Sequence, residues 1–151
     1  MPKPFCITTP IYYVNDRPHI GHIYTTVLAD VIARFHRQLG EPVHFLTGTD
    51  EHGQKVEKAA AARGIAPKAL ADEVVTNYFE VFQRMGFTHD RFIRTTDLDH
   101  RAVVQARFKE LLEKGDIYKA QYEGLYSVSD EAYVTETQAQ ELQAPGLPHQ
   151  L

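Results

Sequence analysis

The sequence is poor in cysteine and has no long apolar run, and each absence limits the class of protein. Its one cysteine, Cys6, permits no internal disulfide bond. Because Cys6 lies in the apolar run Phe5–Thr8, we predict a buried structural thiol rather than a nucleophile. No apolar run approaches the roughly 18 residues that a membrane span needs, and the N-terminus has no signal-peptide pattern. These absences predict a cytoplasmic protein without a membrane partner.

The sequence also lacks the zinc-binding patterns His-Glu-x-x-His and Cys-x-x-Cys, although it contains eight histidines. His19, His22 and His52 could in principle gather around zinc, but without either pattern we predict no metal site. The net charge of −4 argues against a basic footprint for nucleic acid over the whole protein, although a local patch stays open. The 151 residues suffice for one globular domain with a core.

The N-terminal part of the chain is predicted to form a strand, a loop and a helix. Residues 5–9 are apolar and β-branched, which predicts a short strand buried on both faces. Pro10 and the cluster Asn15–Pro18 predict a loop. The helix follows from Ile23 to Leu39, with Gly40 as a plausible C-cap. We expect this helix to pack on a sheet through an apolar stripe made of Ile20, Tyr24, Val27, Leu28, Val31, Ile32, Phe35 and Leu39.

The chain then alternates strands with helices up to Gly115, which favours βαβ units and a parallel sheet. The predicted strands are residues 43–47, ending in a turn at 48–50, and residues 92–94. The predicted helices are residues 53–63, closed by Gly64, residues 67–85, closed by Gly86, and a helix from Thr96 or Asp97 to Gly115.

After Gly115 the pattern changes to short strand-like runs separated by turns, which indicates a small β-rich region. These runs are residues 117–121, 125–128 and 132–135. Thr135 and Gln138 fit a capping box for a short helix. Residues 143–151 lack periodicity, and we expect them to be frayed and disordered.

Two histidines and a glycine stand where the first helix begins. The first N–H groups of a helix lack partners and its dipole favours negative charge, so this is a common place for a phosphate. His19 and His22 can share one face of the first turn and donate to phosphate oxygens. Gly21 lets a flat ligand such as a purine lie against the backbone. Alternatively, the motif is a solvent-exposed cap that happens to contain two histidines.

Candidate binding residues also follow the predicted strands. Ligands gather outside the carboxyl ends of parallel strands, so Tyr13 and Asp50 would share one crevice if their strands are neighbours. Alternatively, Asp50 caps the next helix, and Tyr12 and Tyr13 are ordinary half-buried tyrosines.

The flanks of these residues resemble a known family. The blocks Pro10–Asn15 and Thr47–Lys55, together with the His-Ile-Gly-His motif at residues 19–22, closely resemble methionyl-tRNA synthetases of the class I aminoacyl-tRNA synthetases. Supporting blocks of the same family are Arg91–Asp97, Gly115–Tyr118 and Tyr122–Glu131. The resemblance covers roughly residues 4–142.

The resemblance implies an activity, its substrates and the roles of site residues. The enzyme is a methionine–tRNA ligase that uses ATP with Mg²⁺ to form methionyl-adenylate and then transfers the methionyl group to tRNA(Met). In that family pattern His19, Gly21 and His22 are catalytic and bind ATP, and His52 and Gly53 line the nucleotide side. The predicted methionine-binding residues are Ile11 as pocket wall, Tyr13 as aromatic lid and Asp50 as partner of the α-ammonium group.

The resemblance also implies an architecture and its limits. We expect an α/β fold with the first half of a Rossmann-like parallel-sheet nucleotide-binding domain at residues 1–115, the start of a connective insertion at 116–142 and a tail at 143–151. The family's second half of the sheet, its Lys-Met-Ser-Lys-Ser loop and its helical anticodon domain have no counterpart here. We therefore expect an N-terminal fragment that is inactive alone.

The insertion departs from the family pattern at one place, and two alternative functions stay open. Many family members have a Cys-x-x-Cys zinc knuckle where this chain has Ser127-Val128-Ser129-Asp130, so we expect no structural zinc.

One alternative function is that of a related nucleotidyltransferase, which shares His-x-Gly-His. The other is that of a non-catalytic half-domain that only binds nucleotide.

Overall fold

The computed structural model describes residues 3–127 and 130–142. The chain divides into two compact units, Met1–Arg107 and Phe108–Leu151, which we describe separately. The expected tail at residues 143–151 and the positions 128 and 129 lie outside the described residues. The domain limits at residues 115 and 142 stay a prediction. Within the described ranges, no helix combines the length and apolarity needed to cross a membrane.

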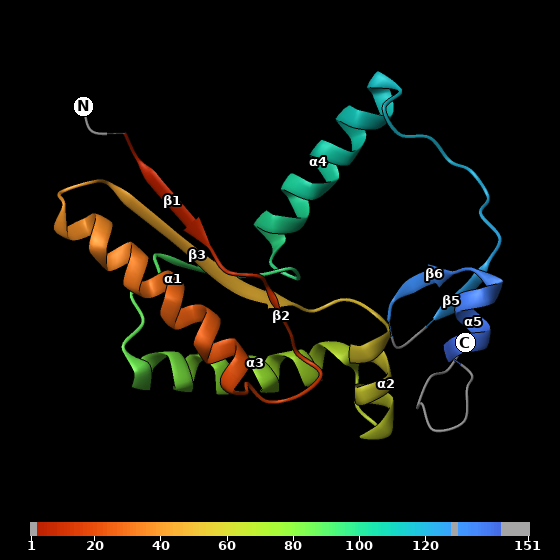
Figure 1. The fold of residues 1–151 in the computed structure, drawn as a ribbon, viewed down its shortest axis with the longest axis horizontal. Coiled ribbons are helices and arrows are strands. Elements are labelled where there is room, and N and C mark those ends of the chain that lie inside the picture. Colours follow the sequence, from red (N-terminus) through yellow and green to blue (C-terminus); the bar gives the residue numbers. More distant parts are fainter. Residues whose placement is uncertain (1–2, 128–129, 143–151) are drawn as a thin grey trace. The chain divides into compact units, whose positions relative to one another are not determined.

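The first unit is built on a parallel sheet with β3 (Val43–Asp50) at its centre (Figure 1). β1 (Phe5–Thr8) and β2 (Tyr12–Tyr13) pair with successive parts of one edge of β3. β4 (Arg91–Arg94) pairs with the opposite edge. All three pairings are parallel, which confirms the predicted α/β class and its parallel sheet.

β3 is longer than the sequence suggested. Residues 48–50 continue the strand, so the prediction of a turn there is wrong. The reason is pairing on both edges, because β4 contacts residues 46–49 and β2 contacts Thr49 and Asp50. Gly48 permits the close approach of β4, since a Cβ at this position would lie 2.0 Å from the carbonyl oxygen of Ile93.

The helices of this unit begin and end close to the predicted residues. They are α1 (Ile20–Gln38), α2 (Gln54–Ala62), α3 (Pro67–Met85) and α4 (Leu98–Lys114), the last of which ends in the second unit. Pro67 begins α3, where its missing N–H needs no partner. Gly86 ends it with a left-handed φ of 66°.

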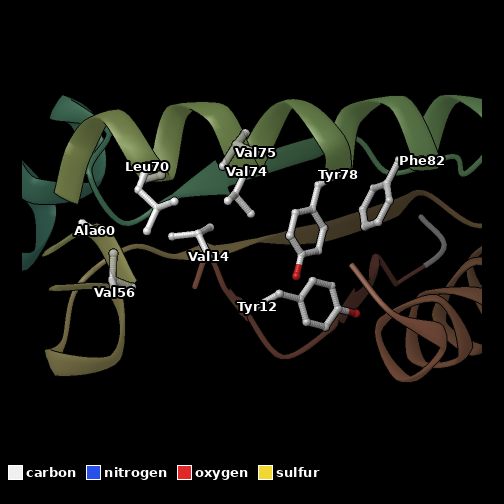
Figure 2. Packing of buried hydrophobic residues seen from close by; sticks show 10 residues of the cluster. Tyr12, Val14, Val56, Ala60, Leu70, Val74, Val75, Tyr78 and Phe82 are labelled. Carbon is white, nitrogen blue, oxygen red and sulfur yellow. The ribbon is translucent and has the colours of Figure 1, made fainter. Parts of the chain in front are cut away.

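The main core lies between α3, α2 and β2 (Figure 2). The side chains that recur at helical spacing along α3 are buried there from Leu70 to Phe82, and the last of the series, Met85, is 50% exposed. The side chains of this core are Tyr12, Val14, Val56, Ala60, Leu70, Ala71, Val74, Val75, Tyr78 and Phe82. Burial of large apolar side chains therefore holds α2 and α3 against β2, the strand that carries Tyr13 of the predicted site.

The apolar stripe of α1 does not pack on the sheet, so this prediction is wrong. Val27 is half-buried, and the other seven side chains of the stripe are exposed, from Ile32 at 41% to Ile20 at 81%. The buried residues of α1 are instead Thr26, Ala29, Asp30 and Ala33. Small alanine side chains let the helix lie close to β3, where Ala29 and Ala33 contact Phe45.

β1 is buried on one face only, which overturns the prediction of burial on both faces. Phe5 and Ile7 are half-buried, and the Phe5 ring stacks on His36 of α1 at 3.6 Å between ring centroids. Cys6 and Thr8 alternate with them and are exposed. The predicted buried thiol is therefore wrong, because the described residues leave that face of β1 uncovered.

In the second unit, β5 (Leu125–Ser127) and β6 (Ala132–Val134) form an antiparallel pair followed by α5 (Glu136–Leu142). The predicted capping box is confirmed, because Thr135 N–H donates to Gln138 Oε1 at 2.9 Å and Gln138 N–H donates to Thr135 Oγ1 at 3.3 Å. The strand predicted at residues 117–121 is wrong. That stretch has no partner strand among the described residues, and its Tyr118 is 82% exposed.

Candidate functional site

The predicted binding residues of two strands lie side by side at the carboxyl end of the sheet. β2 and β3 are neighbours, and Tyr13 is the register partner of Asp50. The condition for a shared crevice is therefore met. Tyr13 is 38% exposed, and the ammonium of Lys55 lies 5.4 Å from its ring centroid.

One hollow lies beside Asp50, and we name it the Asp50 hollow. It has a volume of about 340 Å³. The predicted residues Ile11, Asp50 and His52 line it together with Thr95 and the first turns of α4. The contribution of α4 consists of His100, Arg101, Val104 and Gln105. This hollow combines one carboxylate, one guanidinium and two imidazoles with apolar wall, as a small polar ligand requires.

A second hollow, the histidine hollow, has a volume of about 360 Å³. It is lined by Ile11, Tyr12, Tyr13, Asn15, Asp16, Arg17, His19 and His22. Ile11 lines both hollows, and six of the eight predicted site residues, Ile11 included, line one hollow or both. Gly21 and Gly53 line neither of the two.

The two histidines hold each other in place at the start of α1. His19 is the N-cap, and its Nδ1 accepts the N–H of Gly21 at 3.1 Å. His22 Nδ1 accepts the N–H of His19 at 3.1 Å, and the two rings stack at 3.8 Å between centroids. Because a backbone donor faces each Nδ1, a neutral ring must place its proton on Nε2. Both Nε2–H groups are then available to donate to an anion.

The pKa of His22 is lowered, first because the ring is partly buried and then because His19 lies beside it. His22 is therefore a neutral N–H donor at neutral pH. Gly21 has a packing role in this arrangement, since a Cβ on it would lie 3.0 Å from Cε1 of the His19 ring. The space over Gly21 holds the His19 ring, and contact of Gly21 with adenine stays a prediction.

Asp50 is positioned by its strand and does not cap α2. The N-cap of α2 is Gly53, which has a φ of 113° and no side-chain cap bond. This geometry contradicts the capping alternative for Asp50. His52 N–H lies 3.4 Å from Asp50 Oδ1, so the carboxylate bends toward the turn that follows the strand.

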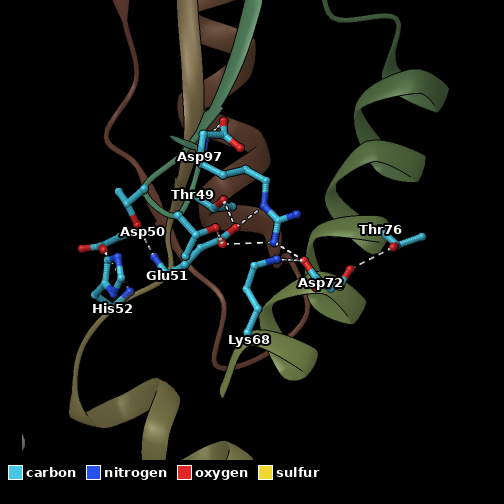
Figure 3. A network of polar contacts seen from close by, with 11 residues as sticks. Thr49, Asp50, Glu51, His52, Lys68, Asp72, Thr76 and Asp97 are labelled. Atoms are coloured by element: carbon cyan, nitrogen blue, oxygen red, sulfur yellow. Dashed lines mark hydrogen bonds and ion pairs between the residues drawn. The ribbon is translucent and has the colours of Figure 1, made fainter. Parts of the chain in front are cut away.

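Between Asp50 and His52, the side chain of Glu51 is fully buried in a polar network (Figure 3). Its carboxylate accepts bonds from the guanidinium of Arg94 and from the hydroxyl of Thr49 at 2.9 Å. Its N–H donates to Thr95 Oγ1 at 2.8 Å. Burial lowers the pKa of Arg94, but the carboxylates of Glu51 and Asp72 outweigh it and raise that pKa overall. The network ties β3 to β4 where the predicted ligand residues begin.

Comparison with known proteins gives the family. The profile described as "tRNA synthetases class I (M)" matches residues 5–145. The chain belongs to this family. A methionine–tRNA ligase of Clostridium perfringens is 54% identical over 136 residues, which are 90% of this chain and 21% of the relative. A second, from Halalkalibacterium halodurans, is 52% identical with the same coverage. The chain thus spans about a fifth of the length of these curated relatives.

A solved structure supports the same placement. The methionyl-tRNA synthetase of Mycobacterium tuberculosis, solved in complex with methionyl-adenylate, matches with a TM-score of 0.85 and 44% identity. The match covers 89% of this chain and 26% of that one. The fold described above is therefore that of the N-terminal region of a class I methionyl-tRNA synthetase.

Several residues that line or support the candidate site were not predicted from the sequence. His100, Arg101 and Val104 line the Asp50 hollow, and Glu51 and Arg94 support it. The α4 residues could have been predicted. β3 and β4 are parallel, so their carboxyl ends lie at the same end of the sheet, and α4 starts after β4. Successive side chains of a strand point to opposite faces of the sheet, so the sequence could also have indicated that Glu51 and Asp50 point to different sides.

No group of three or more histidine, cysteine, aspartate or glutamate side chains is placed to hold a metal in residues 3–127 and 130–142. At the position of the family's zinc knuckle, the hydroxyl of Ser127 donates to Asp130 Oδ2 at 2.6 Å. The expected lack of structural zinc stays a prediction, and residues 128 and 129 lie outside the described part.

Proposed function

We propose that this chain supplies the methionine- and ATP-facing part of a methionine–tRNA ligase. The observation that supports this most directly is the gathering of Tyr13, Asp50, His19 and His22 around Ile11 in a member of this family. The related structure from Mycobacterium tuberculosis, which is a complex with methionyl-adenylate, points to the same substrates. We place the protein in the cytoplasm, where translation would use it.

In the proposed reaction, the carboxylate of L-methionine attacks the α-phosphorus of ATP bound with Mg²⁺, and pyrophosphate leaves. Asp50 receives the α-ammonium group, and Ile11 and Tyr13 contact the side chain. The methionyl group then passes to tRNA(Met). No covalent enzyme intermediate is needed, so the protein acts by positioning and charge stabilisation.

The ATP side of the proposed site uses N–H donors. His19 and His22 donate from Nε2 to phosphate oxygens, where charge increases in the transition state. His52 and Gly53 line the nucleotide side, and Gly21 supports the His19 ring. Because the chain spans about a fifth of its relatives, we expect little or no aminoacylation from it alone.

Methionine binding to the 151-residue chain tests this assignment. We expect L-methionine to shift the NMR amide signals of Ile11, Tyr13 and Asp50, and Asp50→Asn to weaken binding at least tenfold by removing the ion pair. The matched control is Asp116→Asn, at an exposed aspartate of the second unit. Equal methionine affinity in the two variants would contradict the proposed role of Asp50.

Two alternatives are separated by a reaction assay in a complete form, made by exchanging this chain for the matching segment of the Clostridium perfringens relative. A methionine–tRNA ligase gives methionine-dependent ATP–pyrophosphate exchange. A nucleotidyltransferase gives exchange without methionine, and a non-catalytic half-domain gives none.

A further inference from the structure

The hydroxyl of Tyr78 contacts both the predicted ATP side and the predicted methionine side of the site. Tyr78 belongs to α3 and is fully buried, at 0% exposure. Its oxygen lies 3.2 Å from Nδ1 of His22 and 3.3 Å from the carbonyl oxygen of Tyr13. Figure 2 shows the side chain reaching from α3 toward β2, next to Tyr12. One hydroxyl therefore contacts His22, which is predicted to donate a hydrogen bond to phosphate, and the backbone of Tyr13, which is predicted to cover methionine.

The chemistry of these contacts is restricted. The carbonyl oxygen of Tyr13 can only accept a hydrogen bond, and Nδ1 of His22 already accepts the N–H of His19. Tyr78 has one hydroxyl proton, so it shares that proton between these two acceptors. Burial raises the pKa of the Tyr78 phenol, and the nearby Tyr12 and Asp16 raise it further, so the hydroxyl keeps its proton at any physiological pH.

Besides the N–H of His19, the hydroxyl of Tyr78 is the polar group that the described residues place at Nδ1 of His22. His19 stacks on the ring, Tyr12 lies at 4.8 Å between centroids, and Arg17 and Asp16 line the same hollow. Tyr12 differs from Tyr78 in one decisive way. Its hydroxyl bonds to Thr26 Oγ1 at 2.9 Å and to the carbonyl oxygen of His22 at 3.3 Å, and no described bond joins it to the imidazole nitrogens.

We propose that Tyr78 is a positioning residue that fixes the His22 ring with Nδ1 inward and the Nε2 proton toward the histidine hollow. The same hydroxyl bonds to the backbone of Tyr13. It therefore keeps His22, the hydrogen-bond donor to phosphate, and Tyr13, the methionine lid, in one relative position. The consequence for phosphate binding rests on the proposed function. The ring geometry itself does not.

The test is ¹⁵N NMR of the His22 ring in the full 151-residue chain over a range of pH. In the unchanged protein, we expect a neutral ring with its proton on Nε2. Tyr78→Phe removes one of the two donors to Nδ1, so the ¹⁵N shift of Nδ1 should move and the titration midpoint should rise by about half a unit. Tyr12→Phe is the matched control, because it removes a buried hydroxyl from the same cluster without touching a ring nitrogen.

Two results would overturn the proposal. One is a His22 ring in Tyr78→Phe that matches the unchanged protein in both readouts. The other is an equal change in Tyr12→Phe, which would indicate general packing. If Tyr78→Phe does not fold, the unchanged protein still decides, because a bonded Tyr78 hydroxyl proton exchanges slowly and shows a nuclear Overhauser effect to the His22 ring. Absence of that proton signal contradicts the proposal.

Addition of ATP separates this proposal from the proposed function. If both are right, ATP shifts the Nε2–H signal of His22 in the unchanged chain and in Tyr12→Phe, and the shift falls by at least half in Tyr78→Phe. An ATP-insensitive His22 in the unchanged chain would count against its phosphate role. The ring readouts would still decide the positioning role of Tyr78.

Discussion

α1 and α3 are both helices of 19 residues with an apolar stripe, yet they use their stripes in opposite ways. α3 buries Leu70, Val74, Tyr78 and Phe82 in the main core. α1 buries two alanines, Thr26 and Asp30, and exposes its large apolar side chains. The comparison shows that helical periodicity identifies an apolar face but does not say what covers it.

The largest expected difference between the helices comes from shortening one leucine on each. Leu70→Ala in α3 should lower the free energy of unfolding by about 3 kcal/mol, because Leu70 is 2% exposed and its removal leaves a cavity. Leu28→Ala in α1 should change it by less than about 0.5 kcal/mol, since Leu28 is 48% exposed. Urea unfolding of the two variants measures both values. Equal losses would show that the α1 face is covered in solution.

A second change tests the polar attachment of α1. Asp30 accepts the N–H and the hydroxyl of Thr88, each at 2.6 Å, and pairs with Arg34 at 2.7 Å. Asp30→Asn should lower the free energy of unfolding by about 2 kcal/mol, because these charge-assisted bonds are weakened. Denaturation by urea at pH 7 provides the measurement, with Asp116→Asn as control. A loss below that of the control would mean that the alanine contacts alone hold α1.

The pH dependence of that attachment has a defined sign. Burial raises the pKa of Asp30, but the bonds from Thr88 and Arg34 outweigh it and hold the pKa below 3.8. The folded protein therefore binds fewer protons than the unfolded chain, and this stabilisation is present above pH 3.8 and lost as the pH falls through the folded value. Acid unfolding profiles of the unchanged protein and Asp30→Asn should converge at low pH. Parallel profiles would contradict this.

The smallest expected effect concerns His89, which packs against Phe82 of α3. Its Nδ1 is buried without a hydrogen-bond partner among the described residues, and burial lowers its pKa from 6.5. Since the unfolded chain gains the proton first, stability should fall as the pH drops below 6.5. His22 acts in the same direction. His89→Phe should give a flatter curve of melting temperature between pH 7 and pH 5 than the unchanged protein, and an equally steep curve would exclude His89 as a cause.

Local signals in the sequence predicted much of the fold. Pro67 and Gly86 mark the ends of α3, and the stripe between them faces the core. The parallel sheet followed from the alternation of strands and helices, and the shared crevice of Tyr13 and Asp50 was expected if their strands were neighbours, which they are. These features depend on residues close in sequence, or on the general rule that ligands gather at the carboxyl ends of strands.

The errors and omissions have a common cause, which is dependence on distant residues. Cys6 is exposed because one face of β1 is uncovered. The sequence of residues 5–9 alone does not indicate which face other parts of the chain cover. Glu51 meets Arg94, and Tyr78 meets His22, across 43 and 56 residues of chain. Periodicity within one element could not predict such contacts, although each supports a predicted site residue.

In the proposed site, His22 stabilises the charge that develops on the ATP phosphates while methionine is activated. The most direct measurement is methionine-dependent ATP–pyrophosphate exchange in the complete form described above, with and without His22→Ala. We predict a loss of about 3 kcal/mol in transition-state stabilisation, as for removal of one oxyanion donor, with the methionine affinity retained. An unchanged rate of exchange would contradict this role of His22.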